Sequence, residues 1–269
     1  MEAPTTERRT ARSGGAYVDV DGVQTYYEVT GDGDPVILLH GGMCAAETWD
    51  AQVTALAARY RVHVPERFGH GRTPDIEGPI TYENMARHTI GFMEALGLQS
   101  AHLVGWSDGA LVGLLVTLRR PGLVGKLVLI DQFVTLEGAP PWYLSMINAM
   151  AADKIPPGLT EAYAALSPDG GDHFPVVFDK LHRIWTSPTG IELADLANVN
   201  RPTLVVAADG GAITMEHLAQ ARRALPDAQA AVVPGATHRL CQEKPHIVNQ
   251  LLLDFLADEP APKMLGEEG

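Results

Sequence analysis

The chain has 269 residues, long enough for one large domain with an inserted subdomain, and its 46% hydrophobic and 20% charged residues are typical of a globular protein. A net charge of −13, from 20 basic and 33 acidic side chains, argues against binding to nucleic acid or to an anionic membrane surface. No apolar stretch approaches the length of a membrane span.

The N-terminal segment and the cysteines bear on location. The first residues are polar, and Arg8, Arg9 and Arg12 are followed by no apolar core of the kind that a secretion signal needs. Two cysteines, Cys44 and Cys241, favour a reducing compartment over a disulfide framework. We therefore expect a cytoplasmic protein, with a disordered leader over residues 1–14 and a disordered tail over residues 259–269.

Strand-like and helix-like segments alternate along the first half of the chain. Residues 16–20 and 23–30 are β-rich and meet at Asp21-Gly22, which predicts a hairpin. The further predicted strands cover residues 36–40, 61–65, 102–106 and 127–130, and the predicted helices cover residues 48–60, 82–96 and 110–118.

The alternation fails over residues 132–200, which are rich in proline and glycine pairs and hold scattered helix-like pieces. It resumes with predicted strands at 203–208 and 228–233 and predicted helices at 215–225 and 245–256. Strands that alternate with helices predict a mostly parallel sheet covered on both faces, with the hairpin as an antiparallel edge. We predict an α/β core of residues 15–131 and 201–258, interrupted by a cap at 132–200.

One pentapeptide stands out, Gly105-Trp106-Ser107-Asp108-Gly109, because an apolar run ends on it and a helix-like segment begins at once. This layout is typical of a nucleophile elbow, in which a serine sits on a sharp strand-to-helix turn with its hydroxyl exposed. A side chain at either flanking glycine would collide with backbone in so tight a turn. Ser107 is therefore the candidate nucleophile.

A nucleophilic serine needs a base and donors for the oxyanion, and in a parallel sheet these lie at the carboxyl ends of the strands. His238 is the histidine placed just beyond a late strand, which makes it the candidate base. His40 and His70 favour structural roles. The candidate oxyanion donors are the backbone N–H groups of Gly42 and of Asp108, the latter at the start of the helix after Ser107.

Four loops carry a resemblance to a known family. Leu38-Leu39-His40-Gly41-Gly42, Phe68-Gly69-His70-Gly71-Arg72, the pentapeptide around Ser107 and Gly235-Ala236-Thr237-His238 are similar, in order, to the signature loops of the α/β-hydrolase superfamily. The resemblance extends from Ala16 to Leu256 and implies an α/β-hydrolase fold, with a mostly parallel eight-stranded sheet, helices on both faces and an inserted helical cap.

Two aspartates compete for the role of the acid behind His238. Most relatives carry an aspartate at the end of a Gly-x-x-Asp-like loop, but the corresponding stretch here is Ala208-Asp209-Gly210-Gly211. Asp209 lies two residues early, a displacement of roughly 6–7 Å in an extended chain. Asp131 follows the strand after the nucleophile's helix, one strand spacing of roughly 4.8 Å from the nucleophile's strand.

Some members of the superfamily place their acid after this second strand. Zearalenone-type lactonases carry a glutamate there, and this chain resembles them in spacing, since Asp131 lies 24 residues after Ser107. Geometry and the logic of the triad favour Asp131 over Asp209. The alternatives are that Asp131 caps the first turn of the cap and that Asp209 binds loop amides.

The side chain of Asp108 has two interpretations: it faces the pocket, where it pairs with a cationic or hydroxyl group of a substrate, or it only complements the helix N-terminus, which we prefer. Apolar and aromatic residues in the predicted cap are expected to pack it against the core. Four residues are candidates for the substrate pocket: Met43, Trp142, Met146 and Trp185. Cys44 and Cys241 are expected to be packing residues.

These features predict a serine hydrolase that cleaves a carboxylic ester or a lactone, including a macrolactone such as zearalenone, through an acyl-enzyme. Carbon–carbon bond hydrolysis and perhydrolysis use the same triad and stay open, as does a non-hydrolytic, ligand-binding member of the fold. The sequence shows no metal cluster and no phosphate loop, and the chemistry needs no cofactor. The expected partner is a small apolar substrate, with a homodimer left open.

Overall fold

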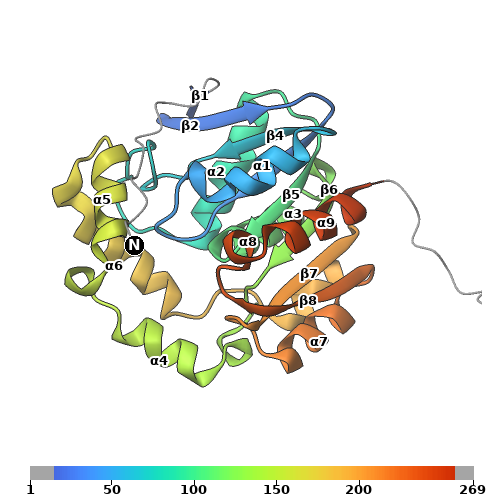
Figure 1. The fold of residues 1–269 in the computed structure, drawn as a ribbon. Helices are drawn as coiled ribbons and strands as arrows, with labels where there is room; N and C mark the ends of the chain where they lie inside the picture. The colour runs from blue at the N-terminus through green and yellow to red at the C-terminus, as the bar shows by residue number, and fades with distance from the viewer. Residues whose placement is uncertain (1–14, 258–269) are drawn as a thin grey trace, which may run out of the picture.

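The structure, a computed structural model, describes residues 15–257. An eight-stranded sheet forms the centre of this part of the chain (Figure 1). The strands lie in the order β1-β2-β4-β3-β5-β6-β7-β8. The pairs β1–β2 and β2–β4 are antiparallel, and the other neighbours are parallel. The strands are β1 (Gly15–Val20), β2 (Val23–Thr30), β3 (Asp34–Leu39), β4 (Tyr60–Pro65), β5 (Ala101–Trp106), β6 (Val124–Ile130), β7 (Thr203–Gly210) and β8 (Ala228–Thr237). The predicted α/β-hydrolase sheet with its antiparallel edge is confirmed.

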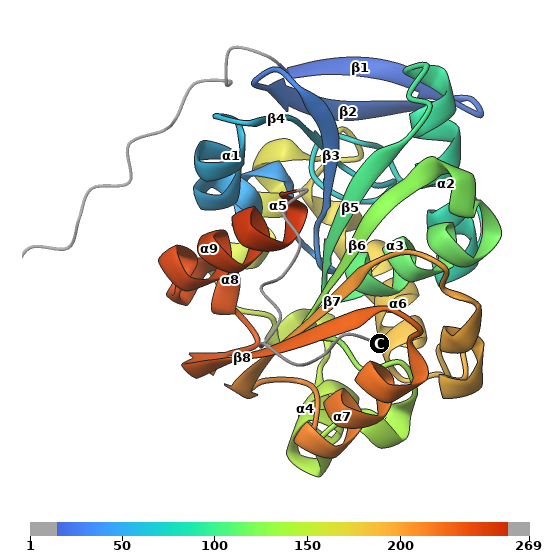
Figure 2. The same cartoon turned by 90° about the vertical axis from the view of Figure 1, so that its right-hand side faces the viewer.

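Helices cover both faces of the sheet (Figure 2). One face packs against α2 (Tyr82–Ala95), α3 (Asp108–Arg119) and α7 (Met215–Ala224). The opposite face packs against α1 (Asp50–Leu56), α8 (Leu240–Glu243) and α9 (Pro245–Leu256). None of the described helices is long and apolar enough to cross a membrane.

The buried stretches of the central strands are mostly apolar because both of their faces are covered by helices. In β3, Ile37 and Leu39 contribute to the core beneath α2 and α3, whereas Val36 and Leu38 contribute to the core beneath α1 and α9. This alternation follows from the two-residue period of a strand. The first hairpin has the turn that its sequence predicts, with positive φ at Asp21 and Gly22 (51° and 85°).

Between β6 and β7 the chain forms a helical layer over one edge of the sheet, residues 132–200, which we call the insertion (Figure 1). Its helices are α4 (Pro141–Ala149), α5 (Pro157–Leu166) and α6 (Phe174–Trp185), with short 3₁₀ turns between them. The insertion is tied to the core at Asp75, whose carboxylate accepts hydrogen bonds from Lys180 Nζ (2.6 Å) and from His173 Nε2 (2.9 Å).

Several predicted boundaries were wrong. The predicted helix 48–60 is a 3₁₀ turn (Ala46–Trp49) followed by the short α1, and β4 already begins at Tyr60. The helix after the nucleophile begins at Asp108 rather than at residue 110, and β8 continues to Thr237 rather than ending at residue 233. The predicted leader and tail lie outside the described residues.

Candidate active site

Ser107 sits on the sharp turn between β5 and α3, with a φ of 56° that non-glycine residues rarely adopt. Its flanking glycines are sterically required. A Cβ atom at Gly105 would lie 2.2 Å from the carbonyl oxygen of Gly109, and one at Gly109 would lie 2.0 Å from the carbonyl oxygen of Leu39. The pentapeptide therefore has the backbone geometry of a nucleophile elbow.

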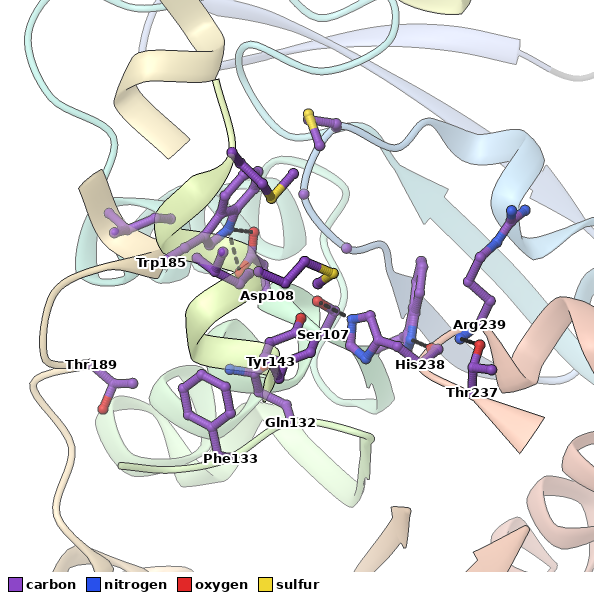
Figure 3. Close-up of a pocket in the computed structure, with 18 of the residues that line it drawn as sticks. Ser107, Asp108, Gln132, Phe133, Tyr143, Trp185, Thr189, Thr237, His238 and Arg239 are labelled. Atoms are coloured by element: carbon purple, nitrogen blue, oxygen red, sulfur yellow. Dashed lines mark hydrogen bonds between the residues drawn. The ribbon is translucent and has the colours of Figure 1, made fainter. Parts of the chain in front are cut away.

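A continuous chain of hydrogen bonds joins the three predicted triad residues (Figure 3 shows its first link). His238 Nε2 lies 3.0 Å from Ser107 Oγ, and His238 Nδ1 lies 2.8 Å from Asp131 Oδ2. Because an ionised carboxylate can only accept, Nδ1 carries the imidazole proton and Nε2 is left to accept the serine hydroxyl proton. This is the arrangement that activates a serine.

Asp131 is fully buried, and its carboxylate accepts two more hydrogen bonds, from the backbone amides of Ala208 (3.0 Å) and Ala212 (2.9 Å). Its backbone adopts a φ of 48°, which turns the side chain from the end of β6 toward β7. A Cβ atom at Gly211, where most relatives are expected to carry the acid, would lie 2.1 Å from Asp131 Oδ1. The Asp131 carboxylate thus occupies the space that a side chain at position 211 would need.

Asp209, the competing acid, does not reach His238. Its exposed carboxylate accepts hydrogen bonds from the backbone amides of Gly235 (3.0 Å) and Ala236 (3.2 Å), and these bonds lower its pKa. The interpretation of Asp209 as a residue that binds loop amides agrees with this geometry. Because these amides precede His238 by three and two residues, Asp209 orders the end of β8 from which the imidazole follows.

Two further contacts fix the backbone at His238. The indole Nε1 of Trp106 donates to the carbonyl oxygen of His238 (2.7 Å), and Glu243 accepts from both the amide and the hydroxyl of Thr237 (2.7 Å each). The imidazole ring itself packs against the rings of Trp106 and Tyr143, at centroid distances of 5.3 and 5.5 Å. The base is therefore held by both its backbone and its ring.

The two predicted oxyanion donors lie beside Ser107. Gly42 is in the loop after β3, and Asp108 is the first residue of α3. No other described residue accepts a hydrogen bond from either amide. A Cβ atom at Gly42 would lie 2.4 Å from the Trp185 ring and 2.6 Å from Asp108 Oδ2, so a larger residue there would displace these side chains. Both amides are thus free to face a developing negative charge.

Ser107 opens onto a cavity of about 540 Å³ between the core and the insertion (Figure 3). The four predicted pocket residues, Met43, Trp142, Met146 and Trp185, all line it. Sequence reasoning missed the remaining side chains of the wall, among them Tyr82, Trp106, Gln132, Phe133, Tyr143, Ile147, Met150, Leu159, Ile184, Thr189, Thr237 and Arg239. Gln132 and Phe133 follow Asp131 directly and could have been found from that position; the others carry no such signal.

The side chain of Asp108 differs from the preferred prediction, in which it merely complements the N-terminus of its helix. It is buried and lies in the cavity wall, where it accepts hydrogen bonds from the hydroxyl of Tyr82 (2.8 Å) and from the indole Nε1 of Trp185 (2.9 Å) (Figure 3). Burial and the Asp108 charge raise the pKa of Tyr82 well above its usual value. Asp108 therefore links the nucleophile elbow to α6 of the insertion.

The cysteines and the other candidate histidines lie outside this constellation. Cys241 is buried in the core against α9, and burial raises the pKa of its thiol. Cys44 packs at the edge of the same core. His40 and His70 are buried behind the loop after β3, and burial lowers the pKa of both, to about 3 for His70. All four agree with the structural roles expected for them.

Comparison with known proteins identifies related chains. A family model described as the alpha/beta hydrolase family matches residues 36–251. A protein of Azorhizobium caulinodans named "Putative carbamate hydrolase RutD" is 28% identical over 254 residues, which cover 87% of this chain and 95% of that protein. The 2-hydroxy-6-oxo-6-(2'-aminophenyl)hexa-2,4-dienoic acid hydrolase of Metapseudomonas resinovorans is 38% identical over 122 residues, 43% of this chain and 41% of that one.

Among solved structures, the enol-lactonase from Burkholderia xenovorans LB400 superimposes with a TM-score of 0.71. The two chains are 20% identical, and the match covers 89% of this chain and 99% of the lactonase. At that identity the likeness establishes a shared fold and leaves the substrate open.

Proposed function

The chain belongs to the alpha/beta hydrolase family, and from that premise we propose that it is a serine hydrolase that cleaves neutral, apolar carboxylic esters or lactones. The single observation that carries this proposal is the continuous hydrogen-bond chain from Ser107 through His238 to Asp131 (3.0 and 2.8 Å), whose Ser107 end opens onto an apolar cavity. The family and the site support the proposal independently.

In the acylation step, Ser107 Oγ attacks the carbonyl carbon of the substrate while His238 Nε2 takes the hydroxyl proton. The imidazolium that forms is stabilised by the Asp131 carboxylate, which two backbone amides also hold in place. The amides of Gly42 and Asp108 donate to the oxyanion of the tetrahedral intermediate. His238 then passes its proton to the leaving alkoxide, which departs as an alcohol.

In the deacylation step, His238 removes a proton from water, and the resulting hydroxide attacks the acyl carbon. The second tetrahedral intermediate uses the same oxyanion donors and collapses to the carboxylic acid, while His238 returns its proton to Ser107 Oγ and so restores the free enzyme. For a lactone, the alcohol and the acid belong to the same molecule, so that the product is a single hydroxy acid. All the groups that these steps require belong to the chain itself.

The charges around the cavity favour a neutral substrate. The Asp108 carboxylate lies in the wall next to the nucleophile, where it would repel an anionic group. Arg239 is the single arginine or lysine among the lining residues, and its side chain extends away from Ser107 (Figure 3). The rest of the wall consists mainly of Trp, Tyr, Phe, Met, Ile and Leu side chains.

Carbon–carbon bond hydrolysis is the principal rival, because one relative is named as a dienoic acid hydrolase. A dienoic acid carries a carboxylate, and binding one here would require it to approach Asp108 without a cation at the reacting end of the cavity. The Asp108 carboxylate would repel other carboxylate substrates in the same way. We therefore rank neutral esters and lactones above the carbon–carbon reaction.

Within the proposed class, a bulky lactone of the zearalenone type is the most specific candidate. The acid after β6 agrees with the placement in zearalenone-type lactonases, and the aromatic wall suits a resorcinol-fused ring. The cavity of about 540 Å³ lies within the range of roughly 300–1,000 Å³ that drug-sized ligands occupy.

Labelling with a fluorophosphonate probe tests whether Ser107 is activated. We expect covalent labelling of the wild type and none of Ser107→Ala, with Ser145→Ala, an exposed serine on α4, as the matched control that labels normally. A wild-type protein that does not react would favour a ligand-binding member of the fold over a hydrolase.

A substrate panel then tests the specificity. Purified protein should hydrolyse p-nitrophenyl butyrate and zearalenone, followed by absorbance and by chromatography, and should leave a 2-hydroxy-6-oxo-dienoic acid unchanged. Turnover of the dienoic acid alone would contradict the proposal and support the carbon–carbon reaction. Turnover of short aryl esters but not of macrolactones would exclude macrolactones from the proposed substrates.

A further inference from the structure

A buried arginine lies directly behind the loop that carries Gly42. Arg67 follows β4 by two residues and is 1% exposed. Its Nη2 donates to the carbonyl oxygens of His40 (2.5 Å) and Gly41 (3.4 Å), and its backbone amide donates to His40 Nε2 (3.2 Å). None of the ion pairs among residues 15–257 involves Arg67. The guanidinium therefore donates its hydrogen bonds to backbone carbonyl groups rather than to a carboxylate.

His40 completes the same arrangement. Because its Nε2 accepts from the Arg67 amide, the proton of the neutral ring is on Nδ1, which donates to the carbonyl oxygen of Gly41 (2.7 Å). Burial, and then the neighbouring Arg67 charge, lower the pKa of His40 well below its usual value. The ring thus stays neutral at physiological pH, and the Gly41 carbonyl accepts a short hydrogen bond from His40 Nδ1 and a longer one from Arg67 Nη2 (3.4 Å).

The Gly41 carbonyl and the Gly42 N–H belong to one peptide unit. This unit is planar and trans, so its C=O and N–H bonds point in opposite directions. Holding the carbonyl toward Arg67 and His40 therefore directs the Gly42 N–H away from them. Gly41 and Gly42 lack side chains that would restrain this plane, since glycine can rotate through conformations closed to other residues. The restraint must come from His40 and Arg67, which donate hydrogen bonds to the Gly41 carbonyl oxygen.

Arg67 also carries a positive charge, which is the sign that stabilises a nearby oxyanion. Burial lowers its pKa to about 10, and the Asp108 charge opposes that shift, so the guanidinium remains protonated at neutral pH. A fixed cation behind the loop favours the negative charge of an oxyanion in front of it.

We propose that Arg67 is a positioning residue of the oxyanion hole: together with His40 it holds the Gly41–Gly42 peptide so that the Gly42 N–H faces the oxyanion formed at Ser107. The inference rests on the proposed function, because it assigns a purpose to Arg67 in that reaction. It predicts that Arg67 contributes to the transition state rather than to substrate binding.

Kinetics on Arg67→Met, Arg67→Lys and Arg72→Met test this role. Loss of one oxyanion donor lowers kcat by about 10²–10³-fold in a serine hydrolase, and we expect about 10²-fold for Arg67→Met with KM changed less than about threefold. Affinity for a phenylboronic acid, which forms a tetrahedral adduct with Ser107, should fall by a similar factor. Arg67→Lys, which keeps the charge and can donate to the same carbonyls, should recover at least about tenfold of kcat.

Arg72→Met is the matched control. Arg72 lies in the same loop and pairs with the buried Glu66 (2.6 Å), but it does not contact the loop at Gly41 and Gly42. This variant should lower the melting temperature while kcat and boronate affinity stay within about threefold of the wild type, as expected for an interaction outside the transition state. Equal kinetic losses in both variants would mean that Arg67 acts only through stability and would overturn the proposal.

A measurement without substrate separates this inference from the proposed function. In amide ¹⁵N relaxation, the Gly42 order parameter should fall from about 0.85 in the wild type to below about 0.6 in Arg67→Met, and it should stay unchanged in Arg72→Met. If the wild type hydrolyses esters but Arg67→Met keeps both its kcat and a rigid Gly42, the inference fails and the proposed function stands. If the wild type hydrolyses nothing, the proposed function fails, and the Gly42 order parameter still decides whether Arg67 holds the peptide.

Discussion

The substitution Asp131→Asn tests the choice of acid most directly. The Asp131 carboxylate accepts three hydrogen bonds, from the amides of Ala208 and Ala212 and from His238 Nδ1. An asparagine has only one acceptor oxygen, so its NH₂ group must face one of these donors. If it faces His238, the imidazole has to move its proton to Nε2 and can no longer accept the proton of Ser107.

The expected loss follows from this tautomer change. In serine proteases, the corresponding substitution lowers kcat by about 10⁴-fold, equivalent to about 5 kcal/mol of transition-state stabilisation. We also expect a loss of about 1–3 kcal/mol in unfolding free energy, because a buried donor is left unpaired. Steady-state kinetics on p-nitrophenyl butyrate and urea unfolding measure the two effects separately.

Asp209→Asn is the matched control, since Asp209 is a strand-end aspartate that binds loop amides and not His238. We expect kcat to fall less than about tenfold, because only the order of the turn before His238 is affected. A collapse of turnover in Asp209→Asn together with a near-normal Asp131→Asn would refute the assignment of the acid.

Moving the acid to the adjacent strand gives a second test. A side chain at position 211 would occupy the space of the Asp131 carboxylate. The double variant Asp131→Gly/Gly211→Asp should therefore recover at least about tenfold of the kcat lost in Asp131→Gly, because a carboxylate would again reach His238. A double variant no faster than Asp131→Gly would indicate that the position of the acid cannot be exchanged in this site.

Three further predictions concern the oxyanion loop, the core and the cavity. Gly42→Ala keeps the backbone N–H, but its Cβ would lie 2.4 Å from the Trp185 ring; the displaced loop should lower kcat by at least about 10²-fold in steady-state assays, and near-normal turnover would show that the loop accepts a side chain without moving this N–H. Because burial lowers the pKa of His63 to about 4, the unfolded chain binds more protons between pH 6.5 and 4, and stability should fall as the pH drops through that window. The contribution is at most about 1.4 kcal/mol per pH unit, and urea unfolding of His63→Leu should show a flatter pH slope than the wild type. Trp142→Ala should raise KM for a macrolactone by about tenfold, with p-nitrophenyl acetate unaffected; equal effects on both substrates would place Trp142 outside the specificity wall.

The order of strands and helices could be predicted because the spacing of apolar residues within each segment differs between a strand and a helix. The central strands are apolar on both faces, and the pentapeptide around Ser107 marks the turn that joins β5 to α3. The predicted end of one strand was wrong because pairing with a neighbouring strand outweighed a local turn signal. Pro234-Gly235 predicts a turn, but β8 extends through it to Thr237, which pairs with Gly210 of β7 after a shift in register.

The sequence alone determined the fold family, the candidate nucleophile and the candidate base, because each depends on a short motif and on its place after a strand. Only the tertiary structure decided which aspartate contacts His238. Asp131 follows β6 and Asp209 lies near the end of β7, and the direction of each side chain depends on its backbone angles and on amide partners that belong to other segments. The contacts of Asp108 with Tyr82 and Trp185, and of Arg67 with Gly41, likewise join residues far apart in the chain, which no local pattern records.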